Sequence, residues 1–371
     1  MMTRPTVLLL IPHLGGGGAE KVFALLAKGL SREKYSRHLA ILLSATAPAH
    51  DLPPEVVVHP LGATRVRTAA LPLLALVRRL KPQVILSGMY HLNFLVLLLR
   101  TFFPGSTRVL VRQNGTLSAS LSQDGPPFYT RFLYRLLYRH ADRIICQTPA
   151  MAADLAAELG LPQDRLAVLL NPLDVVAIRR GMESSASLWP GPGPHLLAVG
   201  RLSREKGFDL LMDAFLSVQE SFPDAQLSIL GTGPEEAALK AQRHDLALDQ
   251  AVHYAGHVDD PCAYFPGASL FVLSSRHEGM PNALLEAAAG GLPLVATLAS
   301  DGVRDLLCNQ PGVWLAANIS APALAASMLQ ALAAFEPGQR FPHPFIENFR
   351  MGRAIQAYED LIDSIIRESR P

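Results

Sequence analysis

Residues 274–297 read SSRHEGMPNALLEAAAGGLPLVAT and follow the apolar run Leu270 to Leu273. The apolar run is typical of a buried strand, and Pro281 stands where a first helical residue is favoured, because proline has no N–H to leave unpaired. The pair Gly290-Gly291 is expected to end that helix. The stretch therefore predicts a strand, a loop carrying Glu278, a short helix and a next strand, which is the order of a parallel α/β sheet. Free N–H groups at the start of the helix favour an anion such as phosphate.

The size and composition of the chain predict two domains. Its 371 residues, 49% of them hydrophobic, are enough for each domain to bury a core of its own. No apolar run approaches the roughly 18 residues of a membrane span, and the first apolar run is too short for a signal sequence.

The three cysteines, Cys146, Cys262 and Cys308, are widely separated. They indicate neither disulfides nor a metal site and favour the reducing cytoplasm.

Charge is distributed unevenly between the two halves. Residues 1–170 hold 19 Lys and Arg against 9 Asp and Glu, a net +10, and the remainder holds 14 against 23, a net −9. A basic half indicates an anionic partner, for which nucleic acid, a membrane surface and a phosphorylated substrate are candidates. Nucleic acid is excluded as a predicted partner, because no zinc-finger spacing or RNA-binding motif is present and bulky apolar residues interleave the arginines.

The first half alternates apolar runs with helical patterns, which predicts a doubly wound parallel sheet. The runs are residues 6–11, 39–43, 56–58, 84–86, 109–111, 144–146 and 166–170. Four glycines at 15–18 follow the first run and would let a ligand approach the backbone closely. They fit neither a dinucleotide fingerprint nor a P-loop, because Glu20 replaces the third glycine and Lys21 precedes valine. A tight turn without a ligand is the alternative.

Residues 126–143 predict a basic helix with aromatic side chains. Arg131, Arg135 and Arg139 recur every four residues, so they share one face of such a helix. That face suits phosphate groups or a membrane interface, where aromatic rings lie among the lipid headgroups. An ordinary surface helix with solvated arginines is the alternative.

A turn at 171–174 and the sequence WPGPGP at 189–194 predict a linker over residues 171–194. It separates domain 1–170 from domain 195–345, in which Arg201 and Lys206 share the loop after the first strand. Two cations before a helix suit a diphosphate, although they could also be ordinary surface cations. In an open parallel sheet, this loop and the Glu278 loop both lie at the ligand-binding edge.

Four motifs in order resemble the retaining, nucleotide-sugar-dependent glycosyltransferases of family four. They are the glycine loop with Ala19-Glu20-Lys21, the Asn-Pro-Leu-Asp turn at 171–174, the loop 200–207, and Glu278 with Glu286 in HEGMPNALLEA. The resemblance covers nearly the whole chain and extends to bacterial enzymes that extend lipid-linked or exopolysaccharide glycans. It implies an α/β fold of GT-B type, with two doubly wound parallel-sheet (Rossmann-like) domains facing across a cleft. Residues 346–371 would form a C-terminal helix that crosses back to the N-terminal domain.

The resemblance also implies roles for individual residues. Arg201 and Lys206 would hold the donor diphosphate, Glu286 the ribose, and Glu278 would be the catalytic residue that faces the sugar. Glu278 would stabilise positive charge at the anomeric carbon. Two groups of loop residues complete the implied donor site: Gly16 and Gly17 at the diphosphate, and Gly279, Met280, Pro281 and Asn282 at the sugar and phosphate. The donor is expected to be a UDP-sugar, because similar chains mostly use it.

The acceptor side departs from the family pattern. Many relatives place a histidine after the strand at 109–111, where this chain has Arg112-Gln113-Asn114-Gly115. Arg112 and Asn114 are therefore predicted only to bind the acceptor, and the departing phosphate to deprotonate it. No Asp-x-Asp occurs, and Asp259-Asp260 lacks partners at ligand spacing. The resemblance thus implies a metal-independent enzyme without cofactor, because the nucleotide-sugar is a substrate.

Relatives that build glycans on polyprenyl diphosphate carry arginines on a helix after this loop. We therefore expect a saccharide acceptor linked to polyprenyl diphosphate, with Arg131, Arg135 and Arg139 at its pyrophosphate. The enzyme would transfer a hexosyl or N-acetylhexosaminyl group in the cytoplasm, in peripheral contact with the anionic inner face of the cytoplasmic membrane. Three alternatives remain: a nucleotide-sugar epimerase on the same fold, a non-catalytic nucleotide-sugar-binding protein, and a membrane-surface protein.

Overall fold

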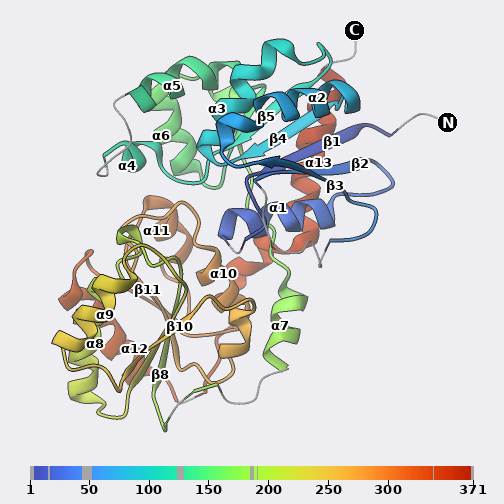
Figure 1. Cartoon of the computed structure of the whole chain (residues 1–371). Coiled ribbons are helices and arrows are strands. Elements are labelled where there is room, and N and C mark those ends of the chain that lie inside the picture. Colours follow the sequence, from blue (N-terminus) through green and yellow to red (C-terminus); the bar gives the residue numbers. More distant parts are fainter. Residues whose placement is uncertain are drawn as a thin grey trace. The chain divides into compact units, whose positions relative to one another are not determined.

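The structure, a computed structural model, describes residues 4–15, 17–43, 52–122, 129–183, 188–189, 191–336 and 338–368. The chain divides into two compact units (Figure 1). The first consists of residues up to Leu173 together with those from Asn348, and the second is Asp174–Glu347. Each unit has its own parallel sheet with helices packed on it, which confirms the predicted α/β class with two doubly wound parallel sheets.

The first unit is built on a seven-stranded parallel sheet in the order β3-β2-β1-β4-β5-β6-β7. Its strands are β1 (Thr6–Ile11), β2 (Ser36–Leu43), β3 (Val57–Ala63), β4 (Val84–Gly88), β5 (Arg108–Arg112), β6 (Arg143–Cys146) and β7 (Leu166–Val168). Its helices are α1 (Gly18–Gly29), α2 (Ala70–Leu80), α3 (Tyr90–Leu99), α4 (Leu117–Ser122), α5 (Tyr129–Leu137), α6 (Pro149–Leu159) and α13 (Met351–Glu368). Four 3-10 turns are η1 (Val66–Ala69), η2 (Arg100–Phe102), η3 (Tyr138–His140) and η4 (Gln163–Arg165).

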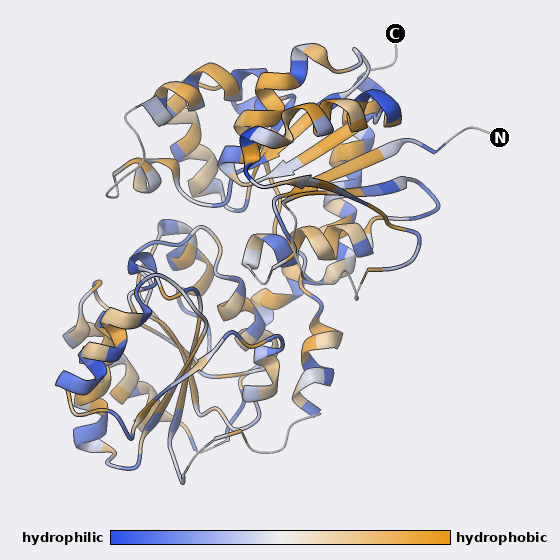
Figure 2. Ribbon diagram, in the orientation of Figure 1, coloured by the Kyte–Doolittle hydropathy of each residue, from blue (hydrophilic) through white to orange (hydrophobic). Residues whose placement is uncertain are grey.

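Two hydrophobic layers cover the sheet of the first unit. Side chains of α2, α3, α5 and α6 pack on one face, and those of α1 and α13 on the other. The strands are mostly apolar in sequence, as the orange arrows in Figure 2 show, because both faces are buried. Helix α13 comes from the far end of the chain, and its Tyr358 and Ile362 are each 1% exposed. The helix begins at Met351, later than residue 346, because residues 344–349 form the 3-10 turn η7 (Pro344–Phe349).

The second unit has a six-stranded parallel sheet in the order β10-β9-β8-β11-β12-β13. Its strands are β8 (His195–Val199), β9 (Gln226–Leu230), β10 (Val252–Gly256), β11 (Leu270–Leu273), β12 (Leu294–Ala296) and β13 (Val313–Leu315). Its helices are α7 (Val175–Glu183), α8 (Phe208–Ser221), α9 (Glu236–Asp245), α10 (Asn282–Ala289), α11 (Asp301–Leu307) and α12 (Ala321–Ala334), with 3-10 turns η5 (Arg204–Lys206) and η6 (Pro261–Tyr264).

In each sheet the chain winds outward in one direction and then returns to the centre to wind the other way. The reversal falls between β1 and β4 in the first sheet and between β8 and β11 in the second. Loops beyond the carboxyl ends of the strands at such a switch point form a ligand-binding crevice. The loop after β8 carries Arg201 and Lys206, and the loop after β11 carries Glu278.

The expected linker at 171–194 contains a helix that the sequence reading did not predict. Helix α7 occupies Val175–Glu183, and its Val175 and Ile178 are buried. The spacing of these two apolar residues gives the helix one face to bury, and it packs on η6 and α10. The helix belongs to the second unit, because the division falls at Leu173.

Candidate functional site

The predicted diphosphate cation and the predicted catalytic carboxylate contact each other in the second unit. Lys206 Nζ lies 2.6 Å from Glu278 Oε1, and Ser275 Oγ donates to the same oxygen at 2.6 Å. The Glu278 side chain is 8% exposed and that of Lys206 is 26% exposed. A carboxylate this buried needs a partner, and Lys206 and Ser275 provide it.

Backbone contacts hold the loops after β8 and β11 together. Ser274 Oγ donates to the Lys206 carbonyl at 2.8 Å, and the Arg276 N–H donates to the Glu205 carbonyl at 2.7 Å. Gly207 has a φ of +64°, and a Cβ there would lie 2.2 Å from the carbonyl oxygen of Ser274. Only glycine permits this approach, so the loops meet at backbone distance.

The loop after β9 supports the same edge of the sheet. A Cβ on Gly231 would lie 1.9 Å from the Gly200 oxygen, and the Leu202 N–H donates to the Thr232 carbonyl at 3.0 Å. Arg201, in the loop thus supported, is exposed. Its guanidinium forms no hydrogen bond or ion pair within the part of the chain that the structure describes. The Arg201 side chain is therefore available to an anion from solution.

The segment before α10 differs by one residue from expectation. Pro281 is the residue preceding the helix, with φ −80° and ψ 93°, and Asn282 is the first helical residue. The N–H groups of Gly279 and Met280 donate to no other residue in the described ranges. Glu286, predicted to bind ribose, is 5% exposed in the middle of α10. The two N–H groups precede the N-cap Pro281 and are therefore available to an acceptor from solution, close to the positive end of the helix dipole.

Gly17, in the glycine run of the first unit, lies next to the buried carboxylate of Glu20. Gly16 lies outside the described residues, and Gly17 immediately precedes α1. A Cβ on Gly17 would lie 2.1 Å from Glu20 Oε2. Glu20 is 6% exposed, with its Oε1 3.6 Å from His13 Nε2. Glu20 belongs to the Ala19-Glu20-Lys21 motif after the glycines, but its sequence did not predict the contact with His13.

Arg112, predicted to bind the acceptor, lies inside the first unit and is 3% exposed. Its guanidinium donates to Asn114 Oδ1, and to Asn171 Oδ1 at 2.5 Å. The Arg112 carbonyl accepts from Asn93 Nδ2 at 3.0 Å. Arg112 thus joins the end of β5 to the turn after β7.

The three arginines expected on one helix face do not share one helix. The predicted helix at 126–143 is corrected: α5 ends at Leu137, η3 follows, and β6 begins at Arg143, because the chain must turn back to reach its place beside β5. Residues 126–128 lie outside the described residues. Arg131 Nη2 pairs with Glu158 Oε2 at 2.6 Å, and Arg135 Nε donates to the Glu158 carbonyl at 3.3 Å. Arg139 belongs to η3.

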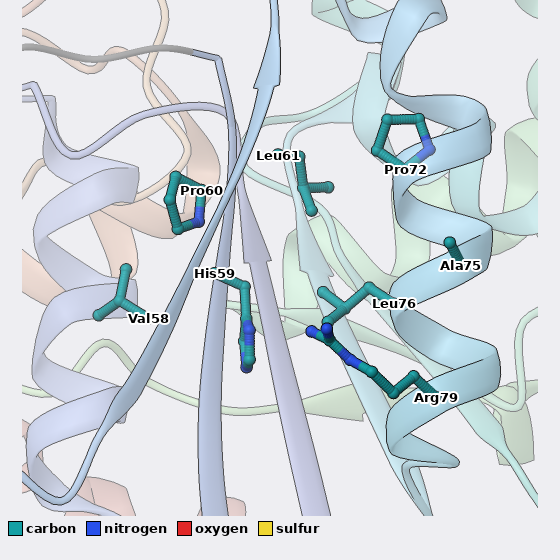
Figure 3. A pocket seen from close by; sticks show the side chains of 8 residues that line it. All are labelled: Val58, His59, Pro60, Leu61, Pro72, Ala75, Leu76 and Arg79. Atoms are coloured by element: carbon teal, nitrogen blue, oxygen red, sulfur yellow. The ribbon is translucent and has the colours of Figure 1, made fainter.

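Two pockets lie elsewhere in the molecule. One of about 420 Å³ lies between β3 and α2, where His59 and Arg79 line an otherwise apolar hollow (Figure 3). The other, of about 610 Å³, lies at the end of α10 beside His343. Neither pocket includes a residue predicted for the donor or acceptor.

The described ranges contain no cluster of three His, Cys, Asp or Glu side chains that could hold a metal ion. Within the same ranges, no helix has the length and apolar character needed to cross a membrane.

Sequence comparisons match both units to glycosyltransferase families. The profile of the glycosyl transferase 4-like domain matches residues 17–172, and that of glycosyl transferases group 1 matches residues 193–334. The lipopolysaccharide core biosynthesis glycosyltransferase LpsE of Rhizobium meliloti is 29% identical over 289 residues, which cover 77% of each chain. The N-acetylgalactosamine-N,N'-diacetylbacillosaminyl-diphospho-undecaprenol 4-alpha-N-acetylgalactosaminyltransferase of Campylobacter jejuni is 27% identical over 310 residues, covering 80% of this chain and 82% of that enzyme.

Solved structures show the same fold. HepE of Anabaena, crystallised with UDP and glucose, superposes with a TM-score of 0.77 at 16% identity, covering 97% of this chain and all of that one. Sucrose-phosphate synthase of Thermosynechococcus elongatus gives 0.74 at 16% identity, covering 98% of this chain and 97% of its own. These likenesses confirm the GT-B fold class. The two sequence profiles together cover well over half of the chain, which therefore belongs to the glycosyltransferases with a 4-like N-terminal and a group 1 C-terminal domain.

Proposed function

We propose that this glycosyltransferase moves a sugar from a nucleoside-diphosphate donor, with UDP-sugars preferred, to a saccharide linked to polyprenyl diphosphate, with retention of anomeric configuration. The observation that carries the proposal is the contact between Lys206 and Glu278 at the switch point of the second sheet. A cation and a carboxylate at this edge match the two needs of the reaction, which are a partner for the diphosphate and a partner for the sugar.

Donor binding would exchange the partners of these two residues. The diphosphate is a stronger partner for the Lys206 ammonium than a single carboxylate is, and exposed Arg201 adds a two-pronged donor to it. Glu278, released from Lys206, would accept a hydrogen bond from a sugar hydroxyl and stabilise positive charge at the anomeric carbon. The free N–H groups of Gly279 and Met280 suit the phosphate, and Glu286 would bind the ribose.

Other parts of the donor site and the chemistry belong to the same proposal. Gly16, Gly17, Pro281 and Asn282 would line the donor. The departing phosphate would take the proton of the acceptor hydroxyl, so neither a metal ion nor a cofactor is required.

Two relatives and the charge of the first unit support the proposed acceptor. One relative is named for the lipopolysaccharide core and the other for a diphospho-undecaprenol glycan. Residues 56–141 of this chain hold 11 Lys and Arg and one acidic residue, Asp124. Leu98, Phe102 and Phe132 on the same part of the chain are each more than half exposed. Apolar side chains among arginines suit peripheral contact with an anionic membrane, here the inner face of the cytoplasmic membrane.

The predicted acceptor residues then divide into two groups. Arg131, Arg135 and Arg139 remain proposed contacts of the acceptor pyrophosphate, and Arg131 would exchange Glu158 for it. Arg112 and Asn114, joined to each other, would shape the acceptor loop.

The test measures nucleotide release from UDP-, GDP- and ADP-sugars with and without a polyprenyl-diphosphate-linked saccharide. Wild type, Lys206→Ala and Glu278→Ala are compared, with Lys240→Ala as control, because Lys240 pairs with Glu236 on an exposed helix. We expect release that depends on the acceptor, is unchanged by a metal chelator and is lost in the two site variants. Nuclear magnetic resonance of the product gives its anomeric configuration. Sugar conversion without acceptor would instead support the epimerase, and transfer unaffected by Glu278→Ala would refute the site.

A further inference from the structure

Arg276 joins the two loops of the candidate donor site through its side chain. Its Nη1 lies 2.6 Å from Asp209 Oδ1, and its Nη2 lies 2.6 Å from Asp209 Oδ2. Nη1 also donates to the Arg204 carbonyl at 3.0 Å. Arg276 stands two residues before Glu278, and Asp209 stands three residues after Lys206 in the first turn of α8. One guanidinium therefore links the segment of the carboxylate to the segment of the lysine.

The geometry of this pair is that of the stronger ion pairs. Two parallel hydrogen bonds fix the orientation of both planar groups, whereas a single contact fixes only a distance. Burial alone would raise the pKa of Asp209, but the hydrogen bonds and charge of Arg276, together with the backbone N–H groups of Leu210 and Asp209, outweigh burial and hold the pKa below its usual value. The Arg276 and Asp209 side chains are 25% and 44% exposed, so the pair lies outside the hydrophobic core.

We propose that Arg276 is a positioning residue for the donor: with Asp209 it holds the loops after β8 and β11 so that Lys206 and Glu278 face one ligand. The inference rests on the proposed function, because it assigns Arg276 to the same donor site. In this role Arg276 would act without touching the donor, because its guanidinium is already bonded to Asp209 and to the Arg204 carbonyl. Its effect passes through Lys206, whose carbonyl and ammonium both contact the loop that Arg276 anchors.

The test is a double-mutant cycle on nucleotide binding, measured by calorimetry with a nucleoside diphosphate and the matching nucleoside monophosphate. Positioning of Lys206 matters most for the diphosphate. Arg276→Ala is therefore expected to weaken diphosphate binding about 10-fold and monophosphate binding about 2-fold, and in a Lys206→Ala background the diphosphate effect should fall to about 2-fold. Asp209→Asn should reproduce the effect of Arg276→Ala. Arg304→Ala serves as control, because Arg304 pairs with Asp301 at 2.6 Å on an exposed helix of the same unit.

The outcomes separate this inference from the proposed function. Equal losses for both nucleotides, or an undiminished loss in the Lys206→Ala background, would mean that Arg276 is only structural and would overturn the inference. If Lys206→Ala weakens diphosphate binding and Arg276→Ala does not, the inference fails and the donor site stands. If Lys206→Ala has no effect, both fail. Should Arg276→Ala unfold, Arg276→Lys keeps the charge without the two-pronged geometry and is expected to give the same selective loss.

Discussion

Lys206 Nζ and Glu278 Oε1 lie 2.6 Å apart although 72 positions separate the two residues in sequence. Each side chain neutralises the charge of the other. Replacing one therefore removes a group from the site and also leaves the charge of its partner uncompensated. We expect Lys206→Ala to lower kcat/KM for glycosyl transfer by about 100-fold or more, which is typical for removing an electrostatic contact to developing charge. Lys240→Ala should retain wild-type kcat/KM. Comparable rates in both variants would contradict the proposed role of Lys206.

Two glycines with similar backbone angles test the closeness of the donor loops. Gly207 has φ +64° with the Ser274 oxygen 2.2 Å from where a Cβ would lie, whereas Gly256 has φ +69° and open space. Gly256→Ala should cost about 1 to 2 kcal/mol of unfolding free energy from the left-handed backbone alone. Gly207→Ala should cost more and also reduce nucleotide binding, as urea titration and calorimetry would show. Equal costs would mean that the loops separate easily.

Asn171 tests whether Arg112 serves the fold. Asn171 Oδ1 accepts a hydrogen bond from the buried guanidinium at 2.5 Å. Its removal by Asn171→Ala should lower the free energy of unfolding by about 1 to 3 kcal/mol, because a buried charged donor loses an acceptor. Exposed Asn318→Ala should change it by less than about 0.5 kcal/mol. Unchanged stability with weakened acceptor binding would instead place Arg112 in direct contact with the acceptor.

Ile362 tests the contribution of α13 to the first unit. Its side chain is 1% exposed in the core formed with α1 and β1. We expect Ile362→Ala to lower the free energy of unfolding by about 2 to 5 kcal/mol through lost burial and a residual cavity. Ile319→Ala, at a side chain that is 39% exposed, is the matched control and should cost much less. Similar values from denaturant unfolding would show that α13 packs only loosely.

Acid should destabilise the protein through His38 and His59. Their rings stack with centroids 5.1 Å apart, and His38 Nδ1 lies 2.8 Å from His59 Nε2. Burial lowers the pKa of both rings, and for His59 the neighbouring His38 and Arg79 lower it further. Below about pH 6.5 the unfolded chain therefore takes up protons that the folded protein does not, and stability falls until the pH reaches the folded pKa values. Urea unfolding at pH 7.5 and 5.5 measures the loss, which His59→Gln should reduce; an unchanged pH dependence in that variant would contradict this assignment.

The sequence was most informative where strands are buried on both faces. The apolar runs at 6–11 and 270–273 predicted β1 and β11 at the bounds observed, because a strand of a covered parallel sheet is apolar along its whole length. The position of Arg201, Lys206 and Glu278 at one edge also followed from the strand-loop-helix pattern, since the carboxyl ends of parallel strands share an edge.

Contacts between distant segments were less accessible to prediction. The pairing of Arg131 with Glu158 depends on α5 lying beside the end of α6, and that of Arg112 with Asn171 on the order of β5, β6 and β7. Each pairing joins residues that are far apart in the chain, so no local sequence pattern predicts it. The extent of the helix expected at 126–143 was wrong for a similar reason, because the need to enter β6 overrides the helical spacing of the arginines.

Helix α13 has a consequence for how the protein is made. Its residues 351–368 complete the core of the first unit but leave the ribosome only after all residues of the second unit, 174–347. The second unit is one continuous segment, so all of its own residues have been synthesised before α13 begins. Until α13 has been synthesised, the face of the first sheet that carries α1 lacks the side chains of α13 that complete its core. We therefore expect the N-terminal unit to complete its core last, against the usual N-terminal-first order of domain folding during synthesis.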